Sequence, residues 1–203
     1  GLRRDGFERA HVLMQLVAEA EESRGQLPFD LLVCPPATLL EMLADLLFGR
    51  SIRLGGQDCH AKLSGAHTGD ISAEMLKDLH CTHVIVGHSE RRTDHRETDA
   101  MVKVKAEAAL SVGLTPIVCV GETLAQRESG VTEAVVAEQL DAVTAETGIG
   151  AWSRAVVAYE PVWAIGTGKT ASPEQAQAVH RFIRARIAQL DSAIAQALQI
   201  LYG

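Results

Sequence analysis

The chain has 203 residues, of which 47% are hydrophobic and 22% are charged, values typical of a globular domain. Its 26 acidic residues outnumber its 19 basic ones, and the net charge of -7 disfavours a broad surface for nucleic acid or an anionic membrane. No apolar run approaches the roughly 20 residues of a membrane span. Four cysteines without a C-x-x-C pair are typical of reduced thiols. We therefore expect a cytoplasmic protein with no nucleic-acid or membrane partner.

Short apolar runs alternate with segments of helical spacing along the whole chain. The runs lack polar alternation, as strands covered on both faces do, and span residues 31–34, 52–54, 83–86, 116–120, 155–159 and 200–202. The predicted helices span residues 5–24, 39–48, 73–80, 99–112, 132–147 and 173–194. Thr38 and Glu41 fit a capping box, and Ser172 before Pro173 combines a cap with a first-turn proline.

This α-β alternation predicts an α/β fold with a parallel sheet and right-handed crossovers. No linker-like segment divides residues 1–203, so we expect a single domain. A closed (β/α)8 TIM barrel needs roughly 250 residues, so such a barrel would lack its first strand and everything after strand seven in the printed chain. An open doubly wound sheet would be complete at this length. Periodicity alone leaves both architectures open.

One predicted strand end carries Gly87, His88 and Ser89, and the histidine makes it a candidate functional site. In parallel α/β folds, sites lie at the carboxyl ends of strands. If a helical turn begins at Ser89, its free N–H groups and positive dipole end disfavour protonation of His88 and leave a neutral electrophile. The alternative is a histidine that caps the strand and hydrogen-bonds locally.

A second strand end delivers Glu160, followed by a loop that is stiff at Pro161, apolar at Trp163 and flexible at Gly166. A carboxylate at the end of a buried strand is partly desolvated, which suits it to act as a base. An apolar loop is costly in water, so it is expected to close over something. The alternative is a loop packed permanently on the rim of the fold.

Three short strings resemble known nucleotide- or metal-binding motifs but do not meet the requirements of those motifs. Residues 163–170 end like a P-loop, but Trp163 stands where that motif needs glycine. Residues 166–171 match a dinucleotide-binding pattern, yet the helix begins too late, after Ser172. His88 and Glu90 imitate the H-x-E of zinc deaminases without the partner P-C-x-x-C. We expect no cofactor and no metal site. Residues 57–70 are expected to form a long loop that is either functional, or reaches a partner, or is a disordered surface loop.

Two long strings together resemble the triosephosphate isomerase family: VIVGHSERR at residues 84–92 and AYEPVWAIGTGK at residues 158–169. Shorter supporting matches are CPP at 34–36, GQD at 56–58, GAHTGD at 65–70, CVGE at 119–122 and ILYG at 200–203. The resemblance favours the (β/α)8 barrel over the open sheet. It implies interconversion of dihydroxyacetone phosphate and D-glyceraldehyde 3-phosphate through an enediolate, without a cofactor.

The resemblance also implies roles for single residues. In this family a glutamate base, a neutral histidine and a closing loop are a well-known case of tuned acid–base chemistry. Glu160 would move the proton between adjacent carbons, and neutral His88 would polarise the carbonyl. Glu90 would help to position the polar network of the site, and Cys119 would pack beneath the glutamate.

The loop after Glu160 would be the lid, with the Gly166 N–H donating to the substrate phosphate and Ile165 covering the base. The lid residues implied in this way are Pro161, Val162, Trp163, Ala164, Ile165, Gly166, Thr167, Gly168, Lys169, Thr170 and Ala171. Closure would exclude water and protect the intermediate from phosphate elimination.

Members of this family are commonly homodimers in which the long loop enters a pocket beside the partner's active site. Thr68 would be the reaching residue, and His67 replaces an aromatic residue that many members carry. The family's first strand supplies an asparagine and a lysine to which no residue here corresponds, and its last phosphate-binding glycines lie beyond Gly203. We therefore expect the natural polypeptide to extend past both ends.

Two other functions compete with the isomerase. A truncated or catalytically dead barrel that acts as a binding or interaction protein would explain the absent lysine, but it has no use for Glu160, His88 and a lid. Another phosphosugar enzyme, such as an epimerase or aldolase, usually needs a metal or a Schiff-base lysine at a strand end. Neither is visible in the sequence.

Overall fold

The computed structural model describes residues 3–25, 27–164 and 170–203. The strands are β1 (Leu31–Val33), β2 (Ile52–Gly56), β3 (His83–Val86), β4 (Thr115–Val120), β5 (Val156–Tyr159) and β6 (Gln199–Tyr202). The α-helices are α1 (Arg3–Arg24), α2 (Leu40–Leu47), α3 (Ala73–Asp78), α4 (Ser89–Asp94), α5 (Asp99–Ser111), α6 (Leu124–Glu128), α7 (Thr132–Thr147), α8 (Pro173–Ala188) and α9 (Ser192–Ala197). Short 3-10 helices span Ala37–Leu39 and Ile149–Arg154.

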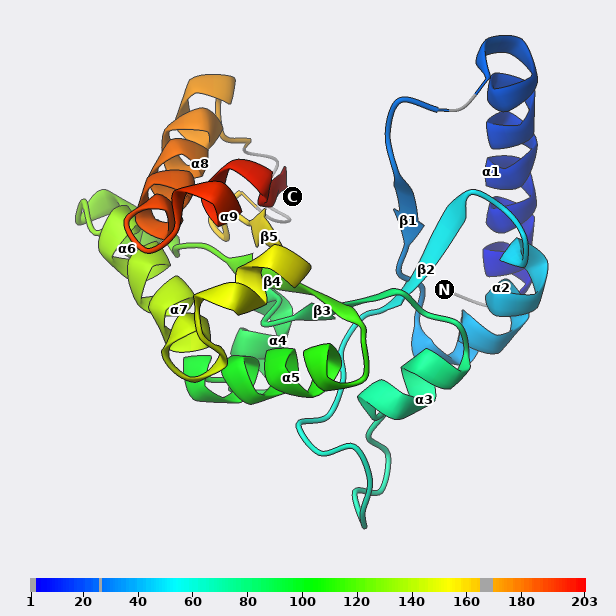
Figure 1. Cartoon of the computed structure of the whole chain (residues 1–203), viewed down its shortest axis with the longest axis horizontal. Coiled ribbons are helices and arrows are strands. Elements are labelled where there is room, and N and C mark those ends of the chain that lie inside the picture. Colours follow the sequence, from blue (N-terminus) through cyan, green and yellow to red (C-terminus); the bar gives the residue numbers. More distant parts are fainter. Residues whose placement is uncertain (1–2, 26, 165–169) are drawn as a thin grey trace.

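The order of the strands separates the two candidate architectures. The six described strands pair in parallel in the order β1-β2-β3-β4-β5-β6, so each lies beside its neighbour in sequence. A doubly wound sheet reverses its strand order part-way, whereas successive right-handed crossovers in one direction wind a barrel. Figure 1 shows the strands following a curve with the helices outside it. The expected barrel-type α/β fold is confirmed, as a curled half-barrel of six strands.

The core lies between the strands and the outer helices. The longer outer helices contribute narrow apolar stripes: Val136 and Leu140 of α7, and Ile183 and Ile187 of α8, are buried and spaced four residues apart. The strands contribute fully buried valines, Val84, Val86, Val118, Val120 and Val157. This packing fixes the carboxyl ends of β3, β4 and β5 relative to one another.

The predicted helix at residues 173–194 is two helices, α8 and α9. The Asp191 carboxylate accepts hydrogen bonds from the N–H groups of Ala193 (2.9 Å) and Ile194 (3.0 Å). A new N-cap therefore starts α9 where periodicity alone continues the helix. The Arg184 guanidinium of α8 also donates to Leu198 O (3.1 Å), which satisfies a carbonyl at the end of α9.

The two capping predictions have opposite outcomes. Ser172 caps α8 in a full capping box with Gln175, and Pro173 is the first helical residue, as predicted. The capping box of Thr38 and Glu41 is wrong, because Thr38 already lies inside a 3-10 turn and no side chain caps α2. Pro36 starts that turn with extended backbone, so the chain begins to coil before Thr38 is reached.

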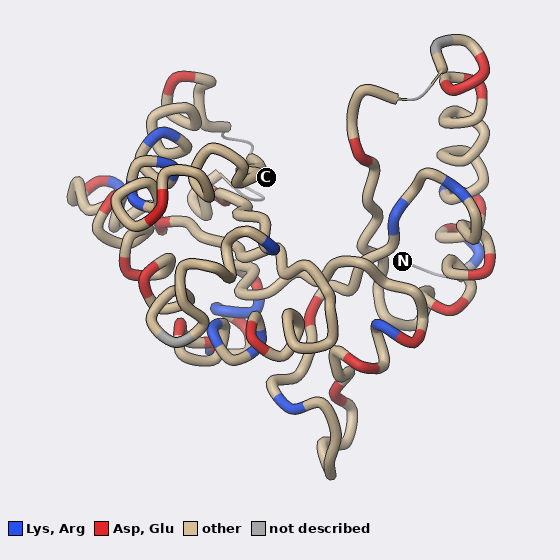
Figure 2. The backbone as a smooth tube through the Cα atoms, viewed as in Figure 1, with Lys and Arg blue, Asp and Glu red and all other residues tan. Residues whose placement is uncertain are grey.

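Among the described residues, none of the helices is both long enough and apolar enough to cross a bilayer. Figure 2 shows Lys and Arg interspersed with Asp and Glu along the outer helices.

Candidate active site

His88 stands where β3 turns into helix α4. Gly87 makes the turn with φ +72°, and a Cβ there would lie 2.8 Å from Val102. His88 is the N-cap of α4, and its Nδ1 accepts the Glu90 N–H at 3.2 Å. A ring nitrogen that accepts a hydrogen bond carries no proton, so this contact favours the neutral ring with its proton on Nε2. The helical turn expected at Ser89 is confirmed.

Glu160 follows β5 and meets His88 across the end of β4. Its Oε1 lies 3.1 Å from His88 Nε2, and its Oε2 accepts the Ser89 N–H at 3.2 Å. The Glu160 side chain is only 10% exposed and the His88 side chain 29% exposed. The structure therefore pairs a shielded carboxylate with a histidine open to a ligand, at the sheet edge where parallel α/β folds hold their sites.

Cys119 and Glu90 differ in their relation to this pair. Cys119 lies on β4 against Glu160, and its burial, together with the carboxylate charge and hydrogen bond, raises the pKa of the thiol well above its usual value. Cys119 is thus a protonated, closely packed neighbour of the glutamate. The Glu90 side chain is 72% exposed, and its Oε2 lies 3.8 Å from His88 Nδ1.

Gly121, which follows β4, lies so close to the Glu160 backbone that only a residue without a side chain fits there. A Cβ at this position would lie 1.8 Å from the Glu160 carbonyl oxygen. The Gln139 side chain of α7 completes the turn, since it accepts the Gly121 N–H at 2.9 Å and donates to the Gly121 carbonyl at 3.2 Å. The predicted site did not include Gly121, because a close approach between two backbones leaves no chemical signature in the sequence.

Glu122 anchors the first part of the loop after Glu160. This fully buried carboxylate accepts hydrogen bonds from Tyr159 Oη (3.1 Å), Trp163 Nε1 (3.0 Å) and Arg127 Nη1 (3.0 Å). The Arg127 guanidinium also lies 4.7 Å over the Trp163 ring. Burial, with the nearby carboxylate, raises the pKa of Tyr159. The one sequence signal for Glu122 is the string CVGE at residues 119–122, and the predicted site did not include this residue.

The two ends of the expected lid are held in place. Pro161 is buried and its carbonyl accepts the Ala164 N–H at 2.7 Å, while Ala171 N–H donates to Tyr202 Oη at 3.3 Å. The remaining expected lid residues divide into Val162 and Thr170, which the structure describes, and Ile165, Gly166, Thr167, Gly168 and Lys169, which lie outside the described residues.

A buried charge cluster lies behind the helix that follows His88. Lys105 Nζ contacts Asp58 Oδ2 at 2.8 Å and Glu97 Oε1 at 2.5 Å, and Arg91 contacts the same two carboxylates at 2.9 and 2.6 Å. Burial outweighs the cations and raises the pKa of Asp58. Burial also acts to raise the pKa of Glu97, but hydrogen bonds from Lys105 and Arg91 outweigh it and lower that pKa. The cluster fixes Arg91, and hence α4, to the strand end after β2.

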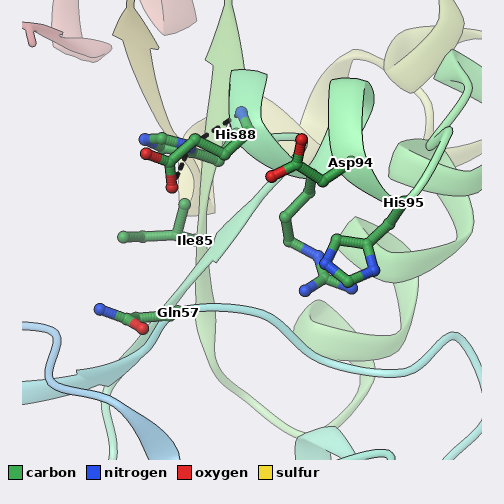
Figure 3. A pocket seen from close by; sticks show the side chains of 7 residues that line it. Gln57, Ile85, His88, Asp94 and His95 are labelled. Carbon is green, nitrogen blue, oxygen red and sulfur yellow. Dashed lines mark hydrogen bonds and ion pairs between the residues drawn. The ribbon is translucent and has the colours of Figure 1, made fainter. Parts of the chain in front are cut away.

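A cavity of about 250 Å³ opens beside His88 (Figure 3). Its walls come from β3, the segment after β2 and the end of α4, and its lining residues are Gln57, Ile85, His88, Glu90, Arg91, Asp94 and His95. Figure 3 shows His88 and Ile85 facing Asp94 and His95 across this space. Thr68 is exposed on the loop between β2 and α3, which extends away from the rest of the chain at the bottom of Figure 1.

Residues 4–203 match the sequence model of a family described as triosephosphate isomerase. This chain belongs to the triosephosphate isomerase family. Proteins named triosephosphate isomerase from Thiobacillus denitrificans, Ralstonia nicotianae and Dechloromonas aromatica are 60%, 55% and 51% identical to it. The three alignments cover 84%, 91% and 94% of this chain and 69%, 75% and 76% of the respective relatives. The resemblance inferred from two motifs thus extends over nearly the whole chain.

Proposed function

We propose that this protein is an enzyme that interconverts dihydroxyacetone phosphate and D-glyceraldehyde 3-phosphate, the activity that its family name denotes. The observation that carries the proposal is the pair of Glu160 and His88, 3.1 Å apart at the carboxyl edge of the sheet. A binding protein on the same scaffold would have no need of a shielded carboxylate beside an uncharged imidazole. Nothing in the site favours that alternative.

Glu160 is the proposed base. Low exposure strips water from its carboxylate, and the Ser89 N–H holds Oε2 in position, so that Oε1 is left to face a substrate carbon. The carboxylate takes a proton from the carbon next to the carbonyl and returns it to the neighbouring carbon. Both transfers use the same oxygen, and the enzyme ends each cycle with the carboxylate ionised.

His88 is the proposed electrophile. Because Nδ1 accepts the Glu90 N–H, the ring proton lies on Nε2. This N–H faces the Glu160 carboxylate in the structure, and a substrate oxygen would accept its hydrogen bond in place of Glu160. The neutral imidazole gives its Nε2 proton to the carbonyl oxygen and takes the proton of the neighbouring hydroxyl oxygen, so one proton moves between the two oxygens of the enediolate while Glu160 moves one between the two carbons. Cys119 and Gly121 hold the backbone and side chain of the base and touch no substrate in this scheme.

The loop after Glu160 is the proposed lid, residues 161–171. Its ends are anchored by Trp163 on Glu122 and by Ala171 on Tyr202. Gly166, which lies between these two anchors in the sequence, is proposed to bind the substrate phosphate. Closure would exclude water from the enediolate and strengthen the electrostatic contacts of the site.

The test is a coupled assay of glyceraldehyde 3-phosphate isomerisation with Glu160→Gln. The amide keeps the shape but cannot accept a proton from carbon, so we expect kcat to fall by about 10²- to 10⁴-fold. Binding of a phosphate-bearing inhibitor should change little, because the amide has nearly the same shape and the substrate phosphate is proposed to bind at Gly166 rather than at residue 160. The matched control is Glu107→Gln on the exposed face of α5, which should leave kcat unchanged. A loss of less than threefold in Glu160→Gln would refute the role of base.

We also propose that the enzyme is a homodimer. The cavity beside His88 is lined by polar side chains and open to solvent, and the loop that carries exposed Thr68 projects from the same chain. A second copy would fill this cavity with its own loop, and the first copy would reciprocate, as a two-fold interface requires.

Sedimentation velocity at micromolar concentration tests the dimer. We expect the unmodified protein to sediment as a dimer and Thr68→Arg, which adds bulk and charge at the loop tip, to shift it toward monomer. Ala134→Arg, on the exposed face of α7, is the matched control and should remain dimeric. An unmodified protein that sediments as a monomer would contradict the proposal.

The cytoplasm is the proposed location. Cys34, Cys59, Cys81 and Cys119 are all free thiols in the structure. Thiols that stay unpaired in a folded protein suit a reducing compartment.

A further inference from the structure

The loop between β2 and α3 brings two histidines and an aspartate together. His60 N–H donates to the Ile71 carbonyl at 2.8 Å, so the two ends of the loop lie side by side. The rings of His60 and His67 stack with centroids 4.0 Å apart, and His60 Nε2 lies 3.7 Å from Asp70 Oδ2. One ligand atom from each of the three side chains lies within 4.8 Å of the others.

Although the sequence led us to expect no metal site, we propose that His60, His67 and Asp70 bind a divalent transition metal ion of the Zn²⁺ type. Two imidazole nitrogens and one carboxylate oxygen are ligands that zinc prefers, and three protein ligands leave a fourth position for water. A tetrahedral ion with bonds of about 2.1 Å needs its ligand atoms about 3.4 Å apart. In the structure the three ligand atoms lie within 4.8 Å of one another, so metal binding requires the exposed Asp70 and half-buried His67 side chains to move closer to His60.

The surroundings of His60 accommodate both of its tautomers. In the metal-free loop its Nδ1 accepts the Lys62 N–H at 3.0 Å. When Nε2 binds a metal, the ring proton resides on Nδ1, so the ring must turn away from the Lys62 N–H and toward the Lys62 carbonyl, which lies 3.4 Å from Nδ1. A ligating histidine usually donates its second N–H to a carbonyl or carboxylate in this way, which fixes the ring.

Gly65 lets His67 fold back over His60. A Cβ at Gly65 would lie 3.1 Å from His67 Nε2, and the residue has φ +131°, which side chains rarely adopt. The glycine therefore keeps the ligand nitrogen of His67 free of a neighbouring side chain. Thr68 lies between two of the proposed ligands in the sequence, so a bound ion would stiffen the tip of the loop.

Calorimetric titration of the purified protein with ZnCl₂, under reducing conditions without chelators, tests the site. We expect one equivalent of Zn²⁺ to bind and to raise the melting temperature. His67→Asn and Asp70→Asn should each weaken binding by at least about tenfold, since each removes a direct ligand. The control is His80→Asn, which removes another exposed histidine at a φ of 60° that asparagine tolerates.

A second readout separates this site from the cysteines. Co²⁺ absorption spectra distinguish thiolate ligands from nitrogen and oxygen ligands, and we expect no thiolate band. Circular dichroism checks that both loop variants fold. The proposal is overturned if one equivalent of Zn²⁺ does not bind, if binding survives in both His67→Asn and Asp70→Asn, or if Co²⁺ acquires a thiolate band. Isomerase activity does not enter this test, so its presence or absence leaves the outcome unchanged.

Discussion

At the scale of single residues, Gly121 couples the end of β4 to Glu160. Its Cα faces the Glu160 backbone so closely that any Cβ would overlap the Glu160 carbonyl oxygen. Relief of that overlap requires one strand end to move, which displaces the carboxylate from His88. Errors of about 1 Å at a catalytic group cost about 10²-fold in rate.

Gly121→Ala is therefore expected to lower kcat by about 10²-fold and to destabilise the fold by about 1–3 kcal/mol. The coupled assay and urea unfolding measure the two effects. Gly150→Ala is the matched control, because a Cβ there meets no atom within 4 Å. A Gly121→Ala enzyme with full activity would show that the strand ends tolerate separation.

The proposed catalytic residues were easier to predict than the residues that hold them. His88 and Glu160 lie within two residues of the end of a buried run, so the strand-end rule made them candidates, and the resemblance to the triosephosphate isomerase family supplied their roles. Glu122 is equally close to the end of its strand, but its structural role is to accept hydrogen bonds from Tyr159, Trp163 and Arg127. These three residues come from other parts of the chain. Only the folded arrangement shows that one carboxylate serves three donors.

At the scale of elements, the positions of the described strands were predicted well, but the expected burial of β6 is wrong, since Leu201 and Tyr202 are exposed, and several helix ends were not predicted. Strand interiors follow from apolar runs that neighbours cover on both faces. Helix ends depend on which side chain satisfies the free N–H groups, and two candidates often compete. Asp191 caps a new helix and so divides the expected helix at residues 173–194. Thr38 does not act as a cap, because the chain already forms a 3-10 turn after Pro36.

Ser172 caps α8 and is also the first residue after the proposed lid. Its Oγ accepts the Gln175 N–H at 3.2 Å, and the Gln175 side chain accepts the Ser172 N–H at 2.9 Å. Ser172→Ala removes half of this capping box, and we expect it to lower the free energy of unfolding by about 1 kcal/mol. Urea unfolding measures the change. Ser64→Ala, at an exposed loop serine, is the control and should lie within about 0.5 kcal/mol of the unmodified protein.

At the scale of the whole molecule, the sequence periodicity predicted parallel strands but not their order. A closed barrel and an open sheet share the same alternation of buried strands and helices, so length was the sole composition-level clue. The two long motifs decided between them by resemblance, and the consecutive order of the six strands now does so on structural grounds. Strand order is a property of tertiary pairing, which no local pattern contains.

The burial of several thiols in one core makes a prediction for the stability of the whole chain in alkali. Burial raises the pKa of Cys34 and of Cys59 to about 12, with the Cys81 and Asp58 charges as the next contributors, and burial raises that of Cys81 to about 11. The ordinary value is 9.0. The folded chain thus holds these protons more tightly than the unfolded chain does.

The stabilisation is complete below pH 9 and is lost as the pH rises toward the folded-state values. We expect the free energy of unfolding to be level from pH 7 to about 8.5 and then to fall, by up to about 1.4 kcal/mol per pH unit for each thiol that ionises only on unfolding. Urea unfolding in a reducing buffer at pH 7 to 10.5 measures the curve. Cys59→Ala should be less stable at every pH because it leaves a cavity, yet show a shallower alkaline slope, since one buried thiol no longer titrates. Equal slopes in the two proteins would mean that Cys59 ionises as readily when folded as when unfolded.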